Sequence, residues 1–478
     1  MSEPELKKIK INQYPNTPIA DKNNNRCIFF ITKKNRQCGM LKSGQSKDYC
    51  TEHLNYLKKK NGEAIHNGKK GKRVPCPLDP NHTCWEIDLK KHLKKCNKLK
   101  EMDLNTGKSW FKLNCNCIQA STTIKIPENI KEIIVEKVLP LLENIIKDSP
   151  DFIKDPGMEL LIDNHIENHR VQNLGNKHHA IQQSSLIQHI KKSIGNTKTD
   201  GSDDNNVTSL FIEFGCGRAE LSRYLNLSLA LDVQDNIINN TNRTNFLLID
   251  RGHNRMKFDN KFKTDVQFIT TGNIATGKYN LDKVVREKVD IKDISLLDLI
   301  KEDSFNDLDQ VVSISKHLCG AATDLTLTCL KNYHDATTTD MLIVIAMCCR
   351  HVCDPNNYVN MPFIERILEK YKDCDKKEED SITPTVFFYA LTKLVSWATC
   401  GRREDIDDDS TTHFSKKSVE EREQLGMISR RIIDYGRYEY VKTHFCNNDG
   451  GNKFGIKLVQ YCKPTVSLEN VALVLYKK

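Results

Sequence analysis

Four residues between positions 76 and 96 constrain the fold of this chain more than any other feature. They follow the spacing Cys-x5-His-x9-His-x3-Cys and are Cys76, His82, His92 and Cys96. A short segment between the first two lets both side chains turn toward one point. The last two lie four positions apart, so one face of a helix presents both. Two thiolates and two imidazoles complete a tetrahedral shell, which is typical of structural zinc. We therefore predict a zinc-dependent module of the CHHC type at residues 70–100.

A second quartet with the spacing Cys-x10-Cys-x11-Cys-x2-His lies upstream, and its members are Cys27, Cys38, Cys50 and His53. We predict a CCCH module at residues 20–60. Neither segment has enough large apolar residues for a core, and domains this small usually need a metal or disulfides. Disulfides are the competing explanation, but the polar start MSEPELKKIKINQYP has no hydrophobic signal segment, which argues against export to an oxidising compartment. We expect two structural zinc sites, with Cys84 as a bystander thiol.

The net charge of +9 is divided unevenly along the chain. Residues 1–112 carry 25 Lys and Arg against 11 Asp and Glu, or +14, whereas the remainder carries 47 against 52, or −5. The basic segment 58–73 is either a solvated linker, an import signal, or a contact for a phosphate backbone, and we favour nucleic-acid contact. No apolar run approaches the roughly 20 residues that span a bilayer. We expect an intracellular protein of the nucleus or cytoplasm.

The middle of the chain predicts helices, and we assign residues 120–200 to a helical connector. Residues 126–148 carry apolar side chains at helical spacing, and Pro140 should kink that helix. Residues 178–194 form a second predicted helix, and the polar composition of 195–206 indicates a loop.

From position 207 the pattern changes to apolar strands that alternate with helical segments. The near-continuous apolar runs are SLFIEFG, TNFLLID, LDQVVSISK and DMLIVIA. Such runs are typical of strands buried on both faces of a parallel sheet, so the pattern predicts a doubly wound α/β fold. Two strands close the chain, and a terminal hairpin is the usual ending of class I methyltransferases. We predict a Rossmann-like domain at residues 205–478, with polar insertions at 236–245, 373–381 and 404–413.

The segment FIEFGCGRAELS predicts a strand, a glycine turn and a helix. Gly215 and Gly217 allow positive φ and close approach of a ligand to the backbone. The segment is not the dinucleotide fingerprint, because Glu220 replaces its third glycine. It matches E/D-x-G-x-G, the cofactor loop of S-adenosylmethionine enzymes, in which Glu213 would help to hold the methionine portion. An ordinary βα turn is the alternative.

Three further carboxylates lie at or near predicted strand ends. Asp250 ends the strand LLID, where it would accept both hydroxyls of the cofactor ribose. Asp290 and Asp293 follow the next strand, and we expect one of them to meet the adenine amino group. Each acid alone would more often be a cap or a solvated turn, but together they predict a nucleoside pocket at the carboxyl edge of the sheet.

These motifs resemble those of the eukaryotic tRNA:m(4)X modification enzymes, which methylate a ribose 2′-hydroxyl at nucleotide four of the tRNA acceptor stem. The resemblance runs from about Cys27 to the C-terminus. Beyond the two Cys/His modules, the matching stretches are KHHAIQQSSLI, EFGCGRAELS, LIDRGHNRMKFD, DIKDISL, SKHLCGAATDLTLTCL, IAMCCRHVC, SWATCG and RRIIDYGRYEYV. The resemblance implies S-adenosylmethionine as methyl donor, cytidine or adenosine as the methylated nucleotide, and tRNA as partner. No obligate protein partner is indicated.

Methyl transfer to a hydroxyl requires in-line alignment and removal of a proton. SKHLCG ends the fourth predicted strand, where such enzymes place residues that face the substrate. Lys316 would orient the hydroxyl, or act as base if burial lowers its pKa, and His317 is the alternative base. Loop packing or contact with a substrate phosphate remains open for both residues.

The sequence contains two further clusters of reactive or charged side chains, a cationic loop and a cysteine-rich segment. Arg251, Arg255 and Lys257 form a cationic loop beside Asp250. These residues would bind the acceptor stem, or Arg251 would orient Asp250. The four residues Cys348, Cys349, His351 and Cys353 are too close in sequence to surround one ion readily, so we expect a buried loop on the substrate side. We do not expect Cys115 and Cys117 to be metal ligands.

Two other functions compete with ribose methylation. RNA base methylation is disfavoured because the signature Asp/Asn-Pro-Pro-aromatic is absent from the fourth strand. A non-catalytic zinc-finger RNA-binding scaffold is disfavoured because a relic fold would have no physical need for the glycine loop together with Asp250.

Overall fold

The computed structural model describes residues 26–31, 36–44, 46, 48–60, 65–66, 69–70, 72–96, 98–99, 104–118, 126–148, 156–175, 177–195, 207–235, 237, 242–252, 254, 257–272, 279–371, 382–399, 413–446 and 453–478. The predicted insertion at 373–381 lies outside these residues, as do most of the predicted loop 195–206 and parts of the insertions 236–245 and 404–413. Within the described residues, no helix is long and apolar enough to cross a membrane.

The chain divides into two compact units, residues 1–104 and residues 105–478. The first unit pairs its short strands as β1–β2, β3–β4 and β5–β6, each antiparallel. Its elements are β1 (Phe30–Ile31), β2 (Arg36–Gln37), α1 (Thr51–Lys60), β3 (Ile65–His66), β4 (Lys69–Lys70), β5 (Arg73–Cys76), β6 (Asp79–Trp85), η2 (Glu86–Asp88) and α2 (Leu89–Leu93).

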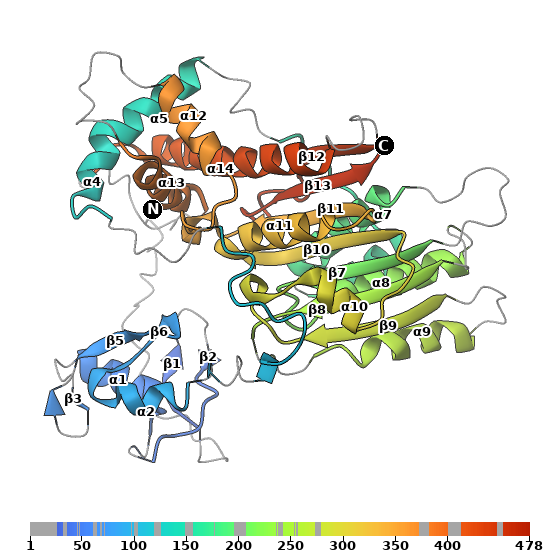
Figure 1. Ribbon diagram of the computed structural model, residues 1–478. Coiled ribbons are helices and arrows are strands. Elements are labelled where there is room, and N and C mark those ends of the chain that lie inside the picture. The colour runs from blue at the N-terminus through green and yellow to red at the C-terminus, as the bar shows by residue number, and fades with distance from the viewer. Residues whose placement is uncertain are drawn as a thin grey trace, which may run out of the picture. The chain divides into compact units, whose positions relative to one another are not determined.

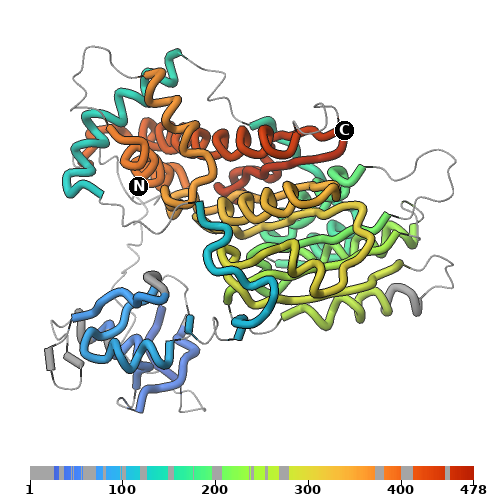
Figure 2. The backbone as a smooth tube through the Cα atoms, in the orientation of Figure 1, coloured from blue at the N-terminus to red at the C-terminus, as the bar shows by residue number. Residues whose placement is uncertain are grey.

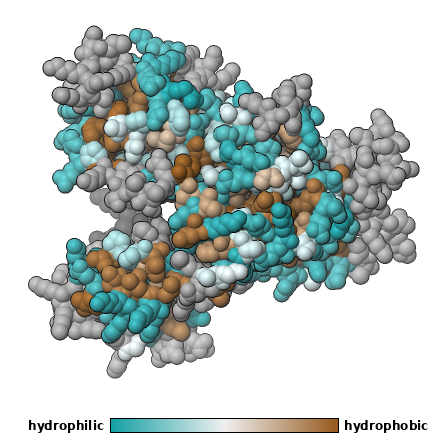
Figure 3. All heavy atoms as spheres, viewed as in Figure 1, coloured by the Kyte–Doolittle hydropathy of each residue, from teal (hydrophilic) through white to brown (hydrophobic). Residues whose placement is uncertain are grey.

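Apolar side chains of the first unit remain largely at its surface. Met40, Leu41 and Ile87 are each more than half exposed, and Figure 3 shows a broad apolar area on this unit. In the first half of this unit, the cluster of buried residues consists of three cysteines, Cys27, Cys38 and Cys50. A unit that buries thiols rather than large aliphatic groups depends on a cross-link or a metal for stability.

The second unit is built on a seven-stranded sheet in the order β12-β13-β11-β10-β7-β8-β9 (Figure 1). The five strands from β11 to β9 are parallel, whereas β13 runs antiparallel to both β11 and β12. All seven residues of β7 are buried, as expected for a strand covered on both faces. The strands are β7 (Thr208–Phe214), β8 (Arg243–Ile249), β9 (Asn280–Glu287), β10 (Gln310–Cys319), β11 (Asp340–Cys348), β12 (Phe454–Gln460) and β13 (Val471–Lys477).

Helices cover both faces of this sheet (Figure 1). The helices α7 (His178–Ser193), α8 (Glu220–Gln234) and α9 (Lys261–Gly272) pack side by side in this order on one face. On the other face lie α10 (Leu296–Glu302) and α11 (Ala321–His334), which also contact each other. The parallel strands and the helices between them confirm the predicted α/β pattern.

A second hydrophobic core joins the helices before the sheet to helices inserted after β11. Figure 2 shows the tube of residues 126–148 beside those of the later helices. The sequence did not indicate that these distant segments share a core. Its members are α4 (Ile130–Ile133), the π-turn η3 (Ile134–Val138), α5 (Leu139–Asp148), α12 (Met361–Lys370), α13 (Pro384–Thr399) and α14 (Val419–Val441). Pro140 is the second residue of α5 and lies two positions after the end of the π-turn. The kink at this proline stays a prediction.

Short turns complete the second unit. They are α6 (Asn164–Ile166), the π-turn η4 (Glu167–Val171), the 3-10 turns η5 (Ile291–Asp293) and η6 (Arg350–Val352), and the π-turn η8 (Lys442–Cys446). The segment 105–118 packs against η5, where Asn116 donates to the carbonyls of Ile291 (2.6 Å) and Ile294 (2.8 Å).

Candidate active site and metal centres

The glycine turn after β7 has the positive φ angles that its two glycines allow. Gly215 and Gly217 have φ of +64° and +52°. A Cβ at Gly215 would lie 3.3 Å from Leu318 Cδ2 and 3.4 Å from the carbonyl oxygen of His317, so this turn approaches β10 closely. Ala219 also has a positive φ, of +62°, and caps the start of α8. The turn therefore presents its backbone at the carboxyl edge between β7 and β10.

Asp250 lies directly after β8 and holds two backbone amides. Its Oδ2 accepts from Gly217 N at 2.7 Å, and its Oδ1 accepts from Gly252 N at 2.6 Å. A carboxylate has about four acceptor positions, so these two bonds fix the group and leave lone pairs for a ligand hydroxyl. The structure thus joins the glycine turn and the predicted ribose carboxylate into one unit.

Glu213 is buried in β7 and faces the start of α8. Its carboxylate accepts from both the backbone amide and the hydroxyl of Ser222. Burial raises the pKa of Glu213 to about 7, while the two bonds from Ser222 and the charge of Arg286 oppose that rise. Glu213 thus ties β7 to the first turn of α8, which follows the glycine turn.

The two later carboxylates have different surroundings. Asp293 is fully buried and accepts from Asn114 N at 2.9 Å, so it anchors the segment 105–118. Asp290 retains 15% of its side-chain surface and lies 3.8 Å from Arg251. Of the pair, Asp290 therefore has the surroundings that a ligand contact requires.

The cationic loop after Asp250 is only partly described. Arg251 and Lys257 are exposed, and the predicted Arg255 lies outside the described residues. Phe258 N donates to the carbonyl of Arg218 at 3.0 Å, so the loop folds back onto the glycine turn.

Lys316 and His317 lie at an irregularity in β10. The register with β11 shifts between Ser315 and Leu318, which is a β-bulge, and bulges often redirect side chains beside active sites. Lys316 Nζ lies 2.8 Å from Nδ1 of His179 in α7. No signal in the sequence selected His179 as a neighbour of this lysine.

The pKa values of Lys316, His179 and His317 are all lowered. Desolvation lowers the pKa of Lys316 to about 8, although Glu220 acts in the opposite direction. The charge of Lys316 and desolvation lower the pKa of His179. Desolvation and the same charge lower the pKa of His317, although that residue keeps exposed surface. Of the two residues that the sequence singled out, Lys316 has the pKa nearer to neutrality, at about 8, whereas the pKa of His317 is about 4.

Arg286 of β9 is a residue that the sequence did not single out. Its guanidinium donates to Cys216 Sγ (2.9 Å) and to the carbonyl of Gly217 (3.1 Å), and it pairs with both oxygens of Asp259 at 2.8 Å. The Arg286 side chain therefore ties the glycine turn to β9. No local sequence pattern identifies such a contact.

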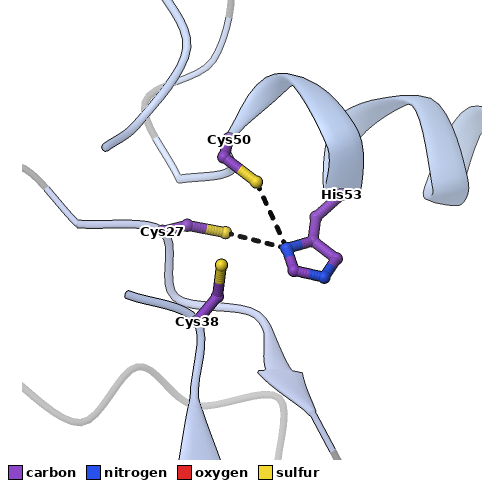
Figure 4. Close-up of side chains that lie close together, drawn as sticks. All are labelled: Cys27, Cys38, Cys50 and His53. Carbon is purple, nitrogen blue, oxygen red and sulfur yellow. Dashed lines mark hydrogen bonds between the residues drawn. The ribbon is translucent and has the colours of Figure 1, made fainter. Parts of the chain in front are cut away.

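The first Cys/His quartet converges on one point (Figure 4). His53 Nδ1 lies 3.4 Å from Cys27 Sγ and 3.3 Å from Cys50 Sγ. The ring of Phe29 stacks on His53 with the centroids 3.9 Å apart, which fixes the orientation of the imidazole. The ligand atoms of all four residues, Cys38 included, lie within 4.8 Å of one another, so the set fits a tetrahedral zinc ion.

The second quartet also converges, through the other imidazole nitrogen. His92 Nε2 lies 3.1 Å from His82 Nε2 and 3.2 Å from Cys76 Sγ, and Cys96 Sγ lies 3.8 Å from Cys76 Sγ. Cys84 pairs with Val74 in the β5–β6 hairpin and is not among the four clustered residues.

A third group of thiols was not predicted. Cys319 at the end of β10 lies with Cys348 and Cys349 at the end of β11, within 4.8 Å for all three sulfur atoms. Cys353 lies apart, where its sulfur accepts from Arg437 Nη2 at 3.2 Å. Cys115 and Cys117 belong to none of the clusters that the described residues form.

Family models match three parts of the chain. The model of methyltransferase TRM13 matches residues 181–476, which include the sheet and the whole candidate site. The chain belongs to the TRM13 methyltransferase family. Residues 25–54 match the CCCH zinc finger of TRM13 proteins, and residues 73–97 match the U11-48K-like CHHC zinc finger. The two quartets therefore belong to zinc fingers, and the resemblance noted in the sequence is confirmed.

Full-length relatives support the same membership of the TRM13 family. The chain is 40% identical to the tRNA:m(4)X modification enzyme TRM13 of Vanderwaltozyma polyspora, over 96% of this chain and 100% of that protein. It is 38% identical to the protein of the same name from Saccharomyces cerevisiae, over 95% of this chain and 96% of that protein. A third relative of this name, from Schizosaccharomyces pombe, is 31% identical over 85% of this chain.

Proposed function

We propose that this chain is an S-adenosylmethionine-dependent tRNA methyltransferase with a class I, Rossmann-like fold. The strand order supports this fold. The strands β8 and β9 follow β7 on one side, β10 and β11 lie on its other side, and the antiparallel β13 pairs with β11, so the strand order reverses between β7 and β10. In open α/β sheets, ligands bind at the carboxyl ends of the strands beside such a switch point. The glycine turn follows β7, and Lys316 lies near the end of β10.

The observation that carries the proposal is the contact between Asp250 and the glycine turn. A carboxylate fixed by the amides of Gly217 and Gly252 has its remaining lone pairs available for the two hydroxyls of a ribose. Asp290 would face the adenine, and Glu213, which accepts from Ser222, would help to hold the methionine portion. We assign a structural role to Asp293, because its carboxylate accepts a hydrogen bond from the backbone amide of Asn114.

The bound cofactor would supply a methyl group on an electrophilic sulfonium. This chain must then align the nucleophile and receive its proton. Lys316 is the better candidate for the proton, since its pKa of about 8 leaves a useful neutral fraction near physiological pH. His317 is exposed beside it and remains the second candidate, or a contact for substrate phosphate.

The proposed substrate is a tRNA, methylated at the ribose 2′-hydroxyl of nucleotide four in the acceptor stem. The names of the relatives specify a tRNA:m(4)X modification, and the family resemblance implies ribose as the target and cytidine or adenosine as the nucleotide. We further propose that each zinc finger binds one zinc ion. The excess of 14 positive charges in residues 1–112 favours contact with the phosphate backbone.

The decisive experiment incubates the purified protein with S-adenosylmethionine carrying a labelled methyl group and with total tRNA. Alkaline hydrolysis then cleaves every linkage except those that follow a 2′-O-methyl ribose. We expect the label in an alkali-resistant dinucleotide that begins with nucleotide four. Label on a base would support RNA base methylation instead. An absence of label in RNA, with intact zinc fingers, would favour a non-catalytic RNA-binding protein.

A further inference from the structure

Three cysteines at the carboxyl edge of the sheet form a cluster that neither the zinc fingers nor the proposed methyl transfer uses. Cys319 Sγ lies 3.9 Å from Cys348 Sγ, and Cys348 Sγ lies 3.2 Å from Cys349 Sγ. Cys319 ends β10 and Cys348, 29 positions later in the sequence, ends β11, while Cys349 follows β11 directly. The cluster is therefore a product of the fold and not of local sequence.

The bulge in β10 brings the first two sulfur atoms together. After the register shift between Ser315 and Leu318, Cys319 pairs directly with Cys348 in the parallel ladder. The side chains of paired residues point to the same face of a sheet. The irregularity that redirects Lys316 thus also aligns these two thiols.

A strained backbone brings in the third sulfur. Consecutive residues of a strand point to opposite faces, so Cys349 would normally turn away from Cys348. Instead, Cys349 has a φ of +48°, in the left-handed region that costs a non-glycine residue free energy. The fully buried Arg350 holds this turn, because it donates to the carbonyl of Met347 (2.7 Å) and pairs with Asp434 (2.7 Å). Strain maintained by a buried ion pair indicates that the position of Cys349 matters.

The spacing of the sulfur atoms fits metal coordination. With zinc–sulfur bonds of about 2.3 Å, tetrahedral sulfur ligands lie about 3.8 Å apart. The Cys319–Cys348 distance of 3.9 Å is close to this value and to the 3.8 Å between Cys76 and Cys96 of the CHHC zinc finger. The closer pair, at 3.2 Å, needs to open by about half an ångström to reach the tetrahedral spacing.

We propose that Cys319, Cys348 and Cys349 bind a thiophilic divalent cation, represented by Zn²⁺, through three thiolates. Soft sulfur ligands select such ions over magnesium or calcium. Three protein ligands leave one coordination position for water or an external ligand, and the exposed Cys319 places the ion within reach of solvent. The ion would clamp the ends of β10 and β11 directly after Lys316 and His317. This inference does not rest on the proposed methyl transfer.

Metal stoichiometry of the unmodified full-length protein gives the first test. The protein is expressed with zinc, freed of loosely bound metal by gel filtration, and analysed for zinc per chain by mass spectrometry. We expect three equivalents, two from the fingers and one from the cluster. Two equivalents, with all three cysteines shown by alkylation to be free thiols, would overturn the proposal. A disulfide between any two of them, found by peptide mapping of the same sample, would also overturn it.

A variant then locates the third ion. Cys319→Ser changes the exposed member of the cluster, so folding should survive, and the zinc content should fall to two equivalents. Cys446→Ser is the matched control, because this half-buried thiol belongs to none of the described clusters. The control should keep three equivalents. Equal zinc content in the two variants would contradict the assignment, and their thermal unfolding midpoints verify that both are folded.

Discussion

The amine of Lys316 lies 2.8 Å from Nδ1 of His179, although 137 positions separate the two residues in the chain. The contact forms because α7 packs across the sheet near β11, while the bulge in β10 turns Lys316 toward that helix. The histidine acceptor fixes the direction of a side chain that otherwise has four rotatable bonds. Desolvation at the same position lowers the pKa of the amine to about 8.

If Lys316 accepts the proton, its neutral amine is the active form. The single-turnover rate of methyl transfer should therefore rise with pH, with a midpoint near 8. Lys316→Ala should lower that rate by about 10²–10⁴-fold, the usual contribution of a general base, without weakening cofactor binding. His317→Ala is the parallel variant, and whichever of the two keeps full turnover is not the base. A rate that falls as pH rises through 8 would show that the charged lysine is required.

His179 is expected to act as a positioning residue for Lys316. His179→Ala removes the acceptor, and the loss of one hydrogen bond to the neutral amine, about 1 kcal/mol, corresponds to roughly fivefold in kcat. The KM for S-adenosylmethionine should stay constant, since the described contacts of the ring are with Lys316 and His317. His179→Asn keeps a side-chain acceptor and should restore part of the rate. A raised KM with unchanged kcat would assign His179 to binding instead.

Asp250→Ala should weaken the binding of S-adenosylmethionine, measured by calorimetry. Each lost hydrogen bond to a charged group costs about 1.5–3 kcal/mol, so we expect at least about 10-fold weaker binding for one lost bond and at least about 150-fold weaker binding for two. Asp282→Ala is the control, because this carboxylate on β9 pairs with Arg243 near the start of β8, at the other edge of the sheet. Unchanged binding by the Asp250 variant would refute the assignment of the ribose contact.

Cys76→Ser removes one ligand from the CHHC zinc finger. The variant should release about one equivalent of zinc, because incomplete structural sites bind weakly, and it should lose more affinity for tRNA than for the cofactor. Cys84→Ser is a close control, since Cys84 is a buried thiol of the same hairpin outside the quartet. Retention of full zinc by the Cys76 variant would contradict the quartet.

The sequence predicted the features that local patterns encode. Continuous apolar runs located the strands β7, β8, β10 and β11, and the spacing of Cys and His selected the two groups that converge in the structure. The glycine turn and Asp250 were also identified, because both adjoin a recognisable strand.

Contacts between distant segments were missed, since they depend on register and packing. Arg286, His179 and the three-cysteine cluster reach the carboxyl edge only after the strands have paired. The choice between Asp290 and Asp293 was undecidable from sequence for the same reason: the buried position of Asp293 is defined by a loop nearly 180 residues earlier.

A crystal structure of the full chain soaked with S-adenosylmethionine tests the central claim most directly. We expect the donor at the carboxyl ends of β7 and β8, with its ribose hydroxyls on Asp250 and its methyl group toward Lys316. A crevice filled by side chains, or a donor bound elsewhere with Asp250 contacting only Gly217 and Gly252, would contradict this claim.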